Sequence, residues 1–175
     1  MLLGDSGTGK THLLIGLGLA ACEQGRRVRY ATTAQLVNEL AEAADGRQLS
    51  RVVARYGRLD LLLLDELGYI RLDPQGAELL FPIITEREVK ASIGLATNLP
   101  FSEWGAVFPD PRLVAAIVDR ATYNAHILET GTQSYRLATS RPHDLPASEP
   151  GARIHDVRFR RSRNPKLCTE PRPLE

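Results

Sequence analysis

The residues best suited to chemistry stand at the start of the chain, in the run Gly-Asp-Ser-Gly-Thr-Gly-Lys-Thr over residues 4–11. The run satisfies the pattern G-x-x-x-x-G-K-[ST], in which glycines let backbone N–H groups curl inward around an anion. In this pattern the lysine, Lys10, reaches the β- and γ-phosphates, and the hydroxyl of Thr11 binds Mg²⁺. A glycine-rich turn that binds nothing is the alternative, but the loop opens a helical pattern, which favours phosphate binding. We therefore expect ATP and Mg²⁺ to bind at Gly4, Gly7, Thr8, Gly9, Lys10 and Thr11.

A second candidate is the acid pair Asp65-Glu66, which ends an apolar run over residues 59–64. Such a run is typical of a parallel strand buried on both faces, and ligand sites gather at the carboxyl ends of these strands. We expect Asp65 to bind Mg²⁺ directly or through water, and Glu66 to polarise the attacking water. The pair therefore indicates hydrolysis as well as binding. The alternative is a charged boundary between strand and loop with no ligand.

Asn98 follows directly after another expected strand, over residues 93–97. A polar amide at that position could orient water or sense the γ-phosphate. Taken alone, it is better explained as a turn residue, because Asn before Leu-Pro suits a loop. The nearby aromatic residues Phe101 and Trp104 are expected to pack under this loop rather than to stack on a base.

Hydrophobic periodicity predicts the elements that must position these residues. Helices are expected over residues 10–23, 48–56, 74–87 and 112–124, with one more after Thr33 as N-cap; strands are expected over 28–33, 59–64, 93–97 and 125–129, and a short one over 135–138. Only three residues precede the glycine-rich run, so the first strand is expected to be truncated. Strands that alternate with helices imply an α/β three-layer sandwich with a mostly parallel central sheet.

The composition is that of an ordinary globular protein of 175 residues, with 43% hydrophobic residues, 25% charged residues and a net charge of +1. Global electrostatics therefore give no argument for a nucleic-acid partner, which would need a local patch. Cys22 and Cys168 have no disulfide or zinc spacing, and no apolar run could span a bilayer. We expect a cytoplasmic protein with no membrane contact, organised as one domain over residues 1–138 and a disordered tail, rich in proline and arginine, over 139–175.

Five segments, taken in order, carry a resemblance to a known family: GDSGTGKTH over residues 4–12, LLLDELGY over 62–69, TNLPFSEW over 97–104, VDR over 118–120 and SYR over 134–136. With these segments the chain resembles the IstB-like ATP-binding family, the helper ATPases of insertion-sequence transposases. That family belongs to the AAA+ group of P-loop NTPases and is akin to the DnaC helicase loaders. The resemblance covers about residues 1–138.

The resemblance implies further roles for single residues. Asn98 becomes the sensor at the end of the fourth strand, and Arg120 looks like the arginine finger that reaches a neighbour's γ-phosphate. Arg136 looks like a further arginine near the nucleotide or the subunit interface. Without the resemblance, either arginine would be an ordinary surface or helix-cap residue.

The resemblance also implies a function: an ATPase that assembles as a homo-oligomer on DNA, with little sequence preference, and regulates a cognate transposase. Two alternatives remain open. One is a DnaC-like helicase loader in replication, and the other is a degenerate remnant that binds nucleotide without function. The helical region that precedes the first strand in the family is absent here, which suggests an N-terminally truncated member and favours the remnant.

A possible DNA surface is a series of arginines at spacings of four, four and three: Arg47, Arg51, Arg55 and Arg58. If these arginines share one face of a helix, they could follow a phosphate backbone. A solvated helix face is the alternative, since no aromatic residues are interleaved for stacking. A second basic cluster, over residues 158–163, is expected to be an incidental part of the tail.

Overall fold

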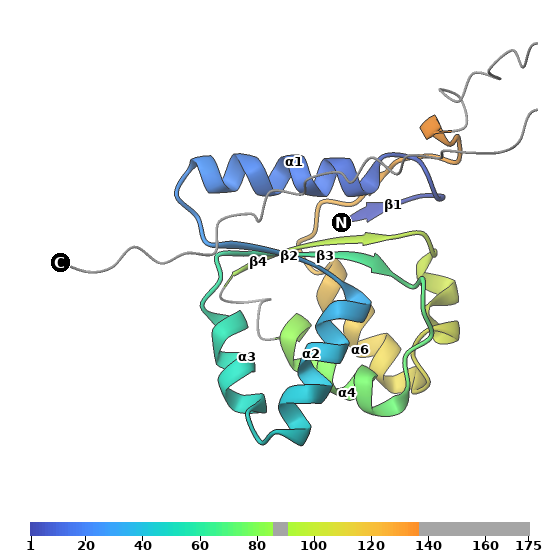
Figure 1. Ribbon diagram of the computed structural model, residues 1–175. Helices are drawn as coiled ribbons and strands as arrows, with labels where there is room; N and C mark the ends of the chain where they lie inside the picture. Colours follow the sequence, from blue (N-terminus) through green and yellow to red (C-terminus); the bar gives the residue numbers. More distant parts are fainter. Residues whose placement is uncertain (86–90, 137–175) are drawn as a thin grey trace, which may run out of the picture.

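A parallel sheet with helices on both faces forms the described part of the chain, which in this computed structural model comprises residues 1–85 and 91–136. Its strands are β1 (Leu2–Leu3), β2 (Val28–Thr32), β3 (Leu61–Leu67), β4 (Ser92–Thr97) and β5 (Leu128–Glu129), in the order β2-β3-β4-β1-β5. The helices are α1 (Lys10–Glu23), α2 (Thr33–Asp45), α3 (Leu49–Gly57), α4 (Pro74–Thr85) and α6 (Pro111–Thr122), with the 3-10 helix η1 (Phe101–Ala106). Helix α1 covers one face of the sheet, and the other labelled helices lie on the opposite face (Figure 1). The predicted α/β class and parallel sheet are therefore confirmed.

Strand β1 is short, as expected, yet it lies inside the sheet. Leu2 and Leu3 pair with Ala96 and Thr97 of β4 on one side and with Leu128 and Glu129 of β5 on the other. The phosphate-binding loop therefore leaves the sheet from a central strand, and its neighbours at that edge are the carboxyl ends of β4 and β5.

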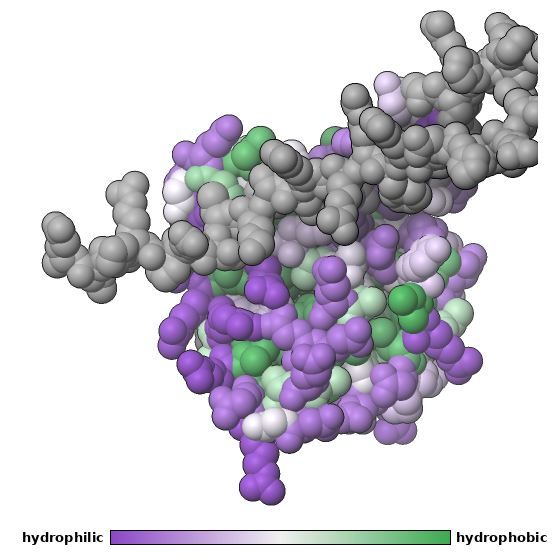
Figure 2. Space-filling view, in the orientation of Figure 1, coloured by the Kyte–Doolittle hydropathy of each residue, from purple (hydrophilic) through white to green (hydrophobic). Residues whose placement is uncertain are grey.

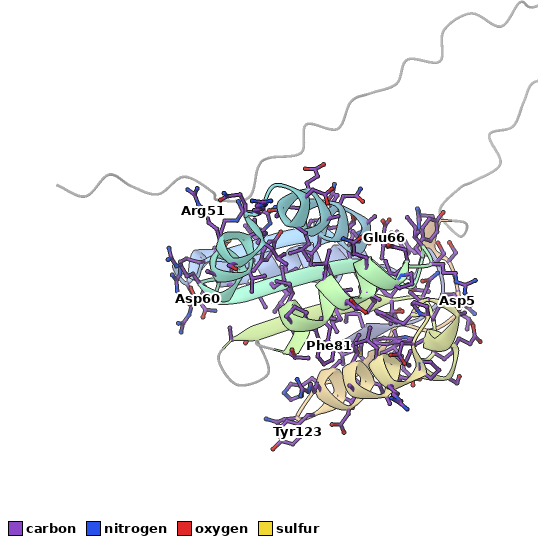
Figure 3. All side chains as sticks on the ribbon, turned by 90° about the horizontal axis from the view of Figure 1, so that it is seen from below. Asp5, Arg51, Asp60, Glu66, Phe81 and Tyr123 are labelled. Carbon is purple, nitrogen blue, oxygen red and sulfur yellow. The ribbon has the colours of Figure 1, made fainter. Side chains whose placement is uncertain are left out.

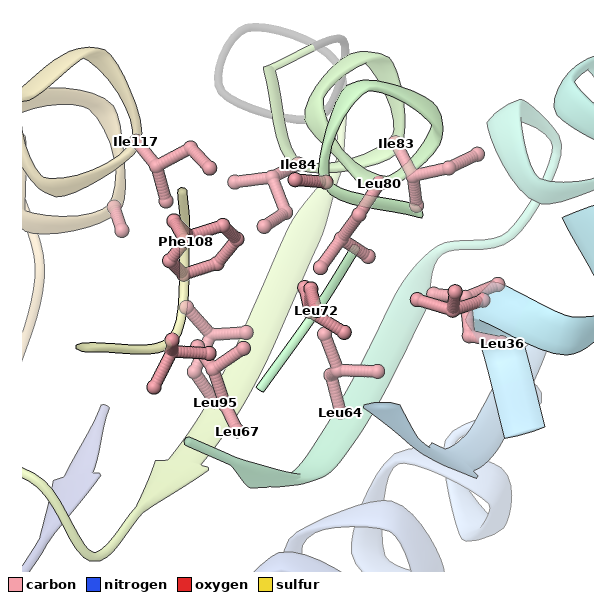
Figure 4. Packing of buried hydrophobic residues seen from close by; sticks show 14 of the residues in the cluster. Leu36, Leu64, Leu67, Leu72, Leu80, Ile83, Ile84, Leu95, Phe108 and Ile117 are labelled. Atoms are coloured by element: carbon pink, nitrogen blue, oxygen red, sulfur yellow. The ribbon is translucent and has the colours of Figure 1, made fainter. Parts of the chain in front are cut away.

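Side chains of β3 alternate between two apolar clusters, because successive residues of a strand point to opposite faces. Leu62 and Leu64 belong to the larger cluster with side chains of α2, α4 and α6, part of which Figure 4 shows. Leu61 and Leu63 belong to a smaller cluster with Leu14 of α1. Each fully buried leucine contributes about 1.5–3 kcal/mol, so this one strand stabilises both faces of the sheet.

Two local predictions were wrong. Thr33 is not the N-cap of α2, because Thr32 takes that place: its hydroxyl accepts from the N–H of Gln35 and the Gln35 side chain accepts from the N–H of Thr32, at 3.3 and 3.2 Å. The expected strand over residues 135–138 is also absent where the structure describes it. Tyr135 and Arg136 are helical, and the next two residues lie outside the described part.

Some sequence expectations cannot be compared with the structure. The tail over residues 139–175, including the basic cluster over 158–163, lies outside the described residues. In the described ranges, none of the helices combines the length and the apolar character that crossing a membrane requires.

Candidate nucleotide-binding site

The loop between β1 and α1 has the backbone of an anion site. Gly7 and Gly9 have φ angles of 88° and 92°, which residues with a Cβ rarely adopt. Gly9 is the N-cap of α1 and supplies no side-chain hydrogen bond, so the first N–H groups of the helix face the loop without an intrahelical acceptor. A Cβ on Gly7 would also overlap the hydroxyl of Ser134. Gly7 is therefore needed both for conformation and for space, and Gly9 for conformation alone.

A pocket of about 650 Å³ joins this loop to the ends of β3 and β4. It brings together most of the residues that the sequence predicts for binding and hydrolysis of a nucleotide. The predicted residues that line it are Gly7, Thr8, Gly9, Lys10, Thr11, Asp65, Glu66, Asn98 and Arg136. Gly4 contributes its carbonyl, which accepts a hydrogen bond from Lys10.

Lys10 is held beside the loop by its backbone carbonyls. Its Nζ donates to the carbonyl oxygens of Gly4 and Asp5 at 2.6 and 2.7 Å. The pKa of Lys10 is lowered, mainly because the side chain is partly buried. The carboxylates of Asp65 and Asp5 raise this pKa, and the charge of Arg136 lowers it, so the effect of burial prevails. Lys10 and Arg136 thus form a positive region in the pocket, which suits a polyanion such as a triphosphate.

Asp65 is a buried carboxylate with both oxygens oriented, only 3% exposed. Oδ1 accepts from the N–H of Glu66 and Oδ2 from the hydroxyl of Tyr30, each at 2.8 Å. Burial and the hydrogen bond to Asp65 raise the pKa of Tyr30, so the hydroxyl remains protonated and able to donate well above neutral pH.

The oxygen ligands in the pocket fit a magnesium ion that is bound partly by phosphates and water, rather than a metal ion bound by protein side chains alone. The described ranges contain no group of three or more His, Cys, Asp or Glu side chains able to hold a metal. The pocket offers the carboxylate of Asp65 and the hydroxyl of Thr11. Mg²⁺ is commonly bound by one or two protein oxygens together with phosphates and water, so these two residues suffice as protein ligands.

Glu66 reaches the pocket through a local irregularity. By alternation along β3 it would point into the larger apolar cluster, where Leu62 and Leu64 lie. The pairing of β3 with β4 shifts register between Leu64 and Leu67, and Glu66 has a φ of 58°. As a result Leu67 fills the cluster and Glu66 is exposed at the pocket wall, which is how β-bulges redirect side chains near active sites.

The loop that carries Asn98 is supported from below, as predicted. Trp104 is 1% exposed, and its Nε1 donates to the carbonyl of Leu99 at 3.3 Å. Phe101 packs against it with ring centroids 5.4 Å apart. These two aromatic residues therefore support the Asn98 loop from the side of the core.

Sequence reasoning missed two contributions to the site. One is Tyr30, whose position on β2 gave no motif. The other is the segment over residues 130–135, which packs on the phosphate-binding loop: Asp5 N–H donates to Gly131 at 3.1 Å and Tyr135 N–H donates to Gly7 at 3.0 Å. These contacts join residues more than a hundred positions apart, so no local pattern reveals them. In the sequence, only the SYR part of the family resemblance pointed towards this segment.

Arg120 is not brought to the pocket. It lies in the last turn of α6, and its guanidinium carbon is 5.4 Å from the centre of the Phe81 ring. Among the described residues it is not part of the pocket wall. Its predicted role therefore requires a pocket on another copy of the chain.

The prediction that four arginines share one face of a helix was wrong. Arg47 has a φ of 56° and takes the left-handed position that ends α2, where the N–H groups of residues 47 and 48 donate back to Ala44 and Ala43. Arg58 caps the end of α3, so only Arg51 and Arg55 lie within that helix.

The two arginines of α3 have different surroundings. Arg55 forms an ion pair with Glu39, which also accepts from Arg29 and from the Tyr56 hydroxyl, each at 2.7 Å. Arg51 is exposed and lies near the end of the molecule that carries Asp60, away from Glu66 and Asp5 (Figure 3).

The fold and the site together define a class of protein: a P-loop protein of the AAA+ type, with an acid pair on β3, the strand beside β4, and an asparagine, Asn98, directly after β4. The chain belongs to the family described as IstB-like ATP binding protein, whose model matches residues 1–142. It is 41% identical over 136 residues to an insertion sequence ATP-binding protein of Sinorhizobium fredii, covering 78% of this chain and 46% of that protein. It is 38% identical over 141 residues to the ATP-binding protein of insertion sequence IS21 from Pseudomonas aeruginosa, covering 81% and 53%.

Solved structures support the same class. AMPPCP-bound DnaA from Aquifex aeolicus matches with a TM-score of 0.61 and 26% identity, over 73% of this chain and 38% of that one. The DnaC helicase loader matches with a TM-score of 0.61 and 24% identity, over 73% and 75%, which shows a shared fold. The chain spans about half the length of the curated relatives it matches.

Proposed function

We propose that this chain binds ATP with Mg²⁺ in the pocket of the phosphate-binding loop and hydrolyses it to ADP and phosphate. The observation that carries the proposal is the meeting of Lys10, Asp65 and Glu66 in one pocket, although they come from two distant segments. The family name and the AMPPCP-bound DnaA structure support a nucleotide as the ligand. Lys10 and the N-terminus of α1 would hold the phosphates.

The side chains divide the chemistry of hydrolysis among them. Glu66, exposed at the pocket wall, accepts the proton of the attacking water, and Asn98 orients that water. Thr11 and Asp65 hold Mg²⁺, which when bound neutralises charge on the phosphate oxygens. Arg136 adds a second positive charge near Lys10.

Arg120 is proposed as a finger supplied to a second copy of the chain. Its position in the last turn of α6, outside the wall of its own pocket, supports action on a neighbour. A guanidinium there would stabilise the charge of the transferring phosphoryl group. Hydrolysis would then depend on assembly into a homo-oligomer.

At the level of the cell, we propose a role in DNA transposition, in which nucleotide-dependent assembly on DNA regulates a transposase. The insertion-sequence names of the relatives at 41% and 38% identity support this role. The exposed arginines Arg47, Arg51 and Arg58 are the proposed DNA contacts, with Arg55 partly engaged by Glu39. They belong to the region of α2 and α3, over which Figure 2 shows a largely hydrophilic surface. A helicase-loader role is less supported, because the likeness to DnaC concerns the fold.

The test is a titration with a fluorescent ATP analogue, followed by ATPase assays with and without DNA. Lys10→Ala should abolish binding, and Arg120→Ala should bind normally but hydrolyse slowly. Mixing the two variants should restore activity, because Lys10→Ala subunits still offer Arg120 to the intact pockets of Arg120→Ala subunits. Parental binding by Lys10→Ala would refute the site. Parental hydrolysis by Arg120→Ala would refute the finger, and binding without hydrolysis under all conditions would favour a remnant.

A further inference from the structure

Tyr30 and Asp65 share one face of the sheet. In the register of β2 and β3, Tyr30 pairs with Leu63, and Asp65 is two residues further along the same face of β3. Tyr30 packs against the small cluster under α1 that contains Leu63. A tyrosine is long enough to reach forward from this position, and its hydroxyl donates to Oδ2 of Asp65 at 2.8 Å.

The Asp65 carboxylate is therefore fixed from two sides. The N–H of Glu66 holds Oδ1 at 2.8 Å, and the Tyr30 hydroxyl holds Oδ2. An ionised carboxylate offers about four lone-pair sites, so each oxygen keeps capacity for a further partner on the pocket side. Without the hydroxyl, Oδ2 would lose its donor and the carboxylate could rotate about its last bond.

We infer that Tyr30 is a positioning residue, whose hydroxyl holds the Asp65 carboxylate in the orientation that binds the divalent cation of the nucleotide complex. The inference rests on the proposed function. Partners that orient a metal ligand typically change metal affinity by about 10- to 100-fold when they are removed. A purely structural role would instead change folding and leave the dependence on Mg²⁺ unaltered.

The test uses Tyr30→Phe, which removes the hydroxyl and keeps the ring packed under α1. Affinity for a fluorescent ATP analogue is measured first in EDTA and then across a Mg²⁺ titration. We expect parental affinity in EDTA and a half-saturating Mg²⁺ concentration about 10-fold higher or more. Tyr56→Phe is the matched control, because it removes a hydroxyl that donates to another carboxylate, Glu39, outside the pocket.

A second measurement tests that Tyr30 acts through Asp65. In an Asp65→Asn background, which has lost the carboxylate, adding Tyr30→Phe should cause no further shift in the Mg²⁺ midpoint. An unshifted midpoint in Tyr30→Phe, an equal shift in Tyr56→Phe, or a further shift in the Asp65→Asn background would each overturn the role. If the parent chain does not bind the ATP analogue, the proposed function itself is overturned. The EDTA and Mg²⁺ titrations of the parent show this outcome independently of the variants.

Discussion

The hydroxyl oxygens of Thr8 and Thr130 lie 2.6 Å apart although the residues are 122 positions apart in the chain. Thr130 is bound to the sheet as well, since its hydroxyl and its N–H donate to the carbonyl of Leu3 at 3.0 and 2.7 Å. The residue that follows β5 thus connects β1 to the phosphate-binding loop. Because β1 has only two residues, this connection adds to the support that the loop receives from the sheet.

Thr130→Val should weaken both the fold and nucleotide binding. Valine keeps the shape but removes the hydroxyl that joins Thr8 to Leu3, so the free energy of unfolding should fall by about 1–2 kcal/mol. Affinity for the ATP analogue should fall several-fold, because the loop loses an anchor. Denaturant unfolding and nucleotide titration measure the two effects. The exposed Thr132→Val is the control and should change neither.

Glu66→Gln should separate binding from hydrolysis. The amide keeps the size of the side chain but cannot accept a proton from water, so hydrolysis should slow by about 10²- to 10⁴-fold while nucleotide affinity is retained. Steady-state ATPase rates at saturating nucleotide give the comparison. Hydrolysis at the parental rate would show that Glu66 is not the base.

Glu66→Gly should stabilise the fold while it abolishes hydrolysis. The φ of 58° is strained for glutamate and free for glycine, so the free energy of unfolding should rise by about 1 kcal/mol. Glu78→Gly is the control, an exposed position inside α4, where glycine should cost about 1 kcal/mol. If both variants lost stability equally, the backbone at Glu66 would carry no strain.

Asp60 should make stability depend on acidic pH. Hydrogen bonds from the side chain and backbone of Arg27 lower the pKa of Asp60 from 3.8 to about 2. Because the folded-state pKa lies below the unfolded value, the stabilisation is complete above about pH 4 and is lost as the pH falls towards 2. Asp60→Asn should therefore be less stable than the parent at neutral pH, with a difference that shrinks below pH 4. Denaturant unfolding at several pH values tests this, and a constant difference would contradict it.

The two arginines of α3 should differ in their effects. Arg51→Ala should lower the slope of log affinity for DNA against log salt by about 1, because an exposed phosphate contact is lost. Arg55→Ala should instead lower the free energy of unfolding by about 0.5–1 kcal/mol, because Glu39 loses a partner. DNA titrations over a salt series, with denaturant unfolding, distinguish them. An unchanged slope in Arg51→Ala would remove α3 from the DNA surface.

Much of the site was predictable because short-range patterns carry it. The glycines and Lys10 lie within seven residues of one another, and Asp65-Glu66 ends an apolar run that is typical of a buried strand. Parallel strands bring their carboxyl ends to one edge, so the P-loop, the acid pair and Asn98 had to meet. Arg47 was misplaced for the opposite reason, since regular spacing does not reveal that a residue ends one helix instead of beginning the next.

The sequence by itself predicted the kind of chemistry, because residue type and local spacing indicate a phosphate-binding loop and an acid pair at the end of a buried strand. The tertiary structure alone decided how those groups are held. A register shift between β3 and β4 turns Glu66 out of the apolar cluster, and the hydroxyl of Tyr30 fixes Asp65 from a neighbouring strand. These contacts depend on strand register and on chain segments that meet only after folding, and no local pattern of residues encodes either of them.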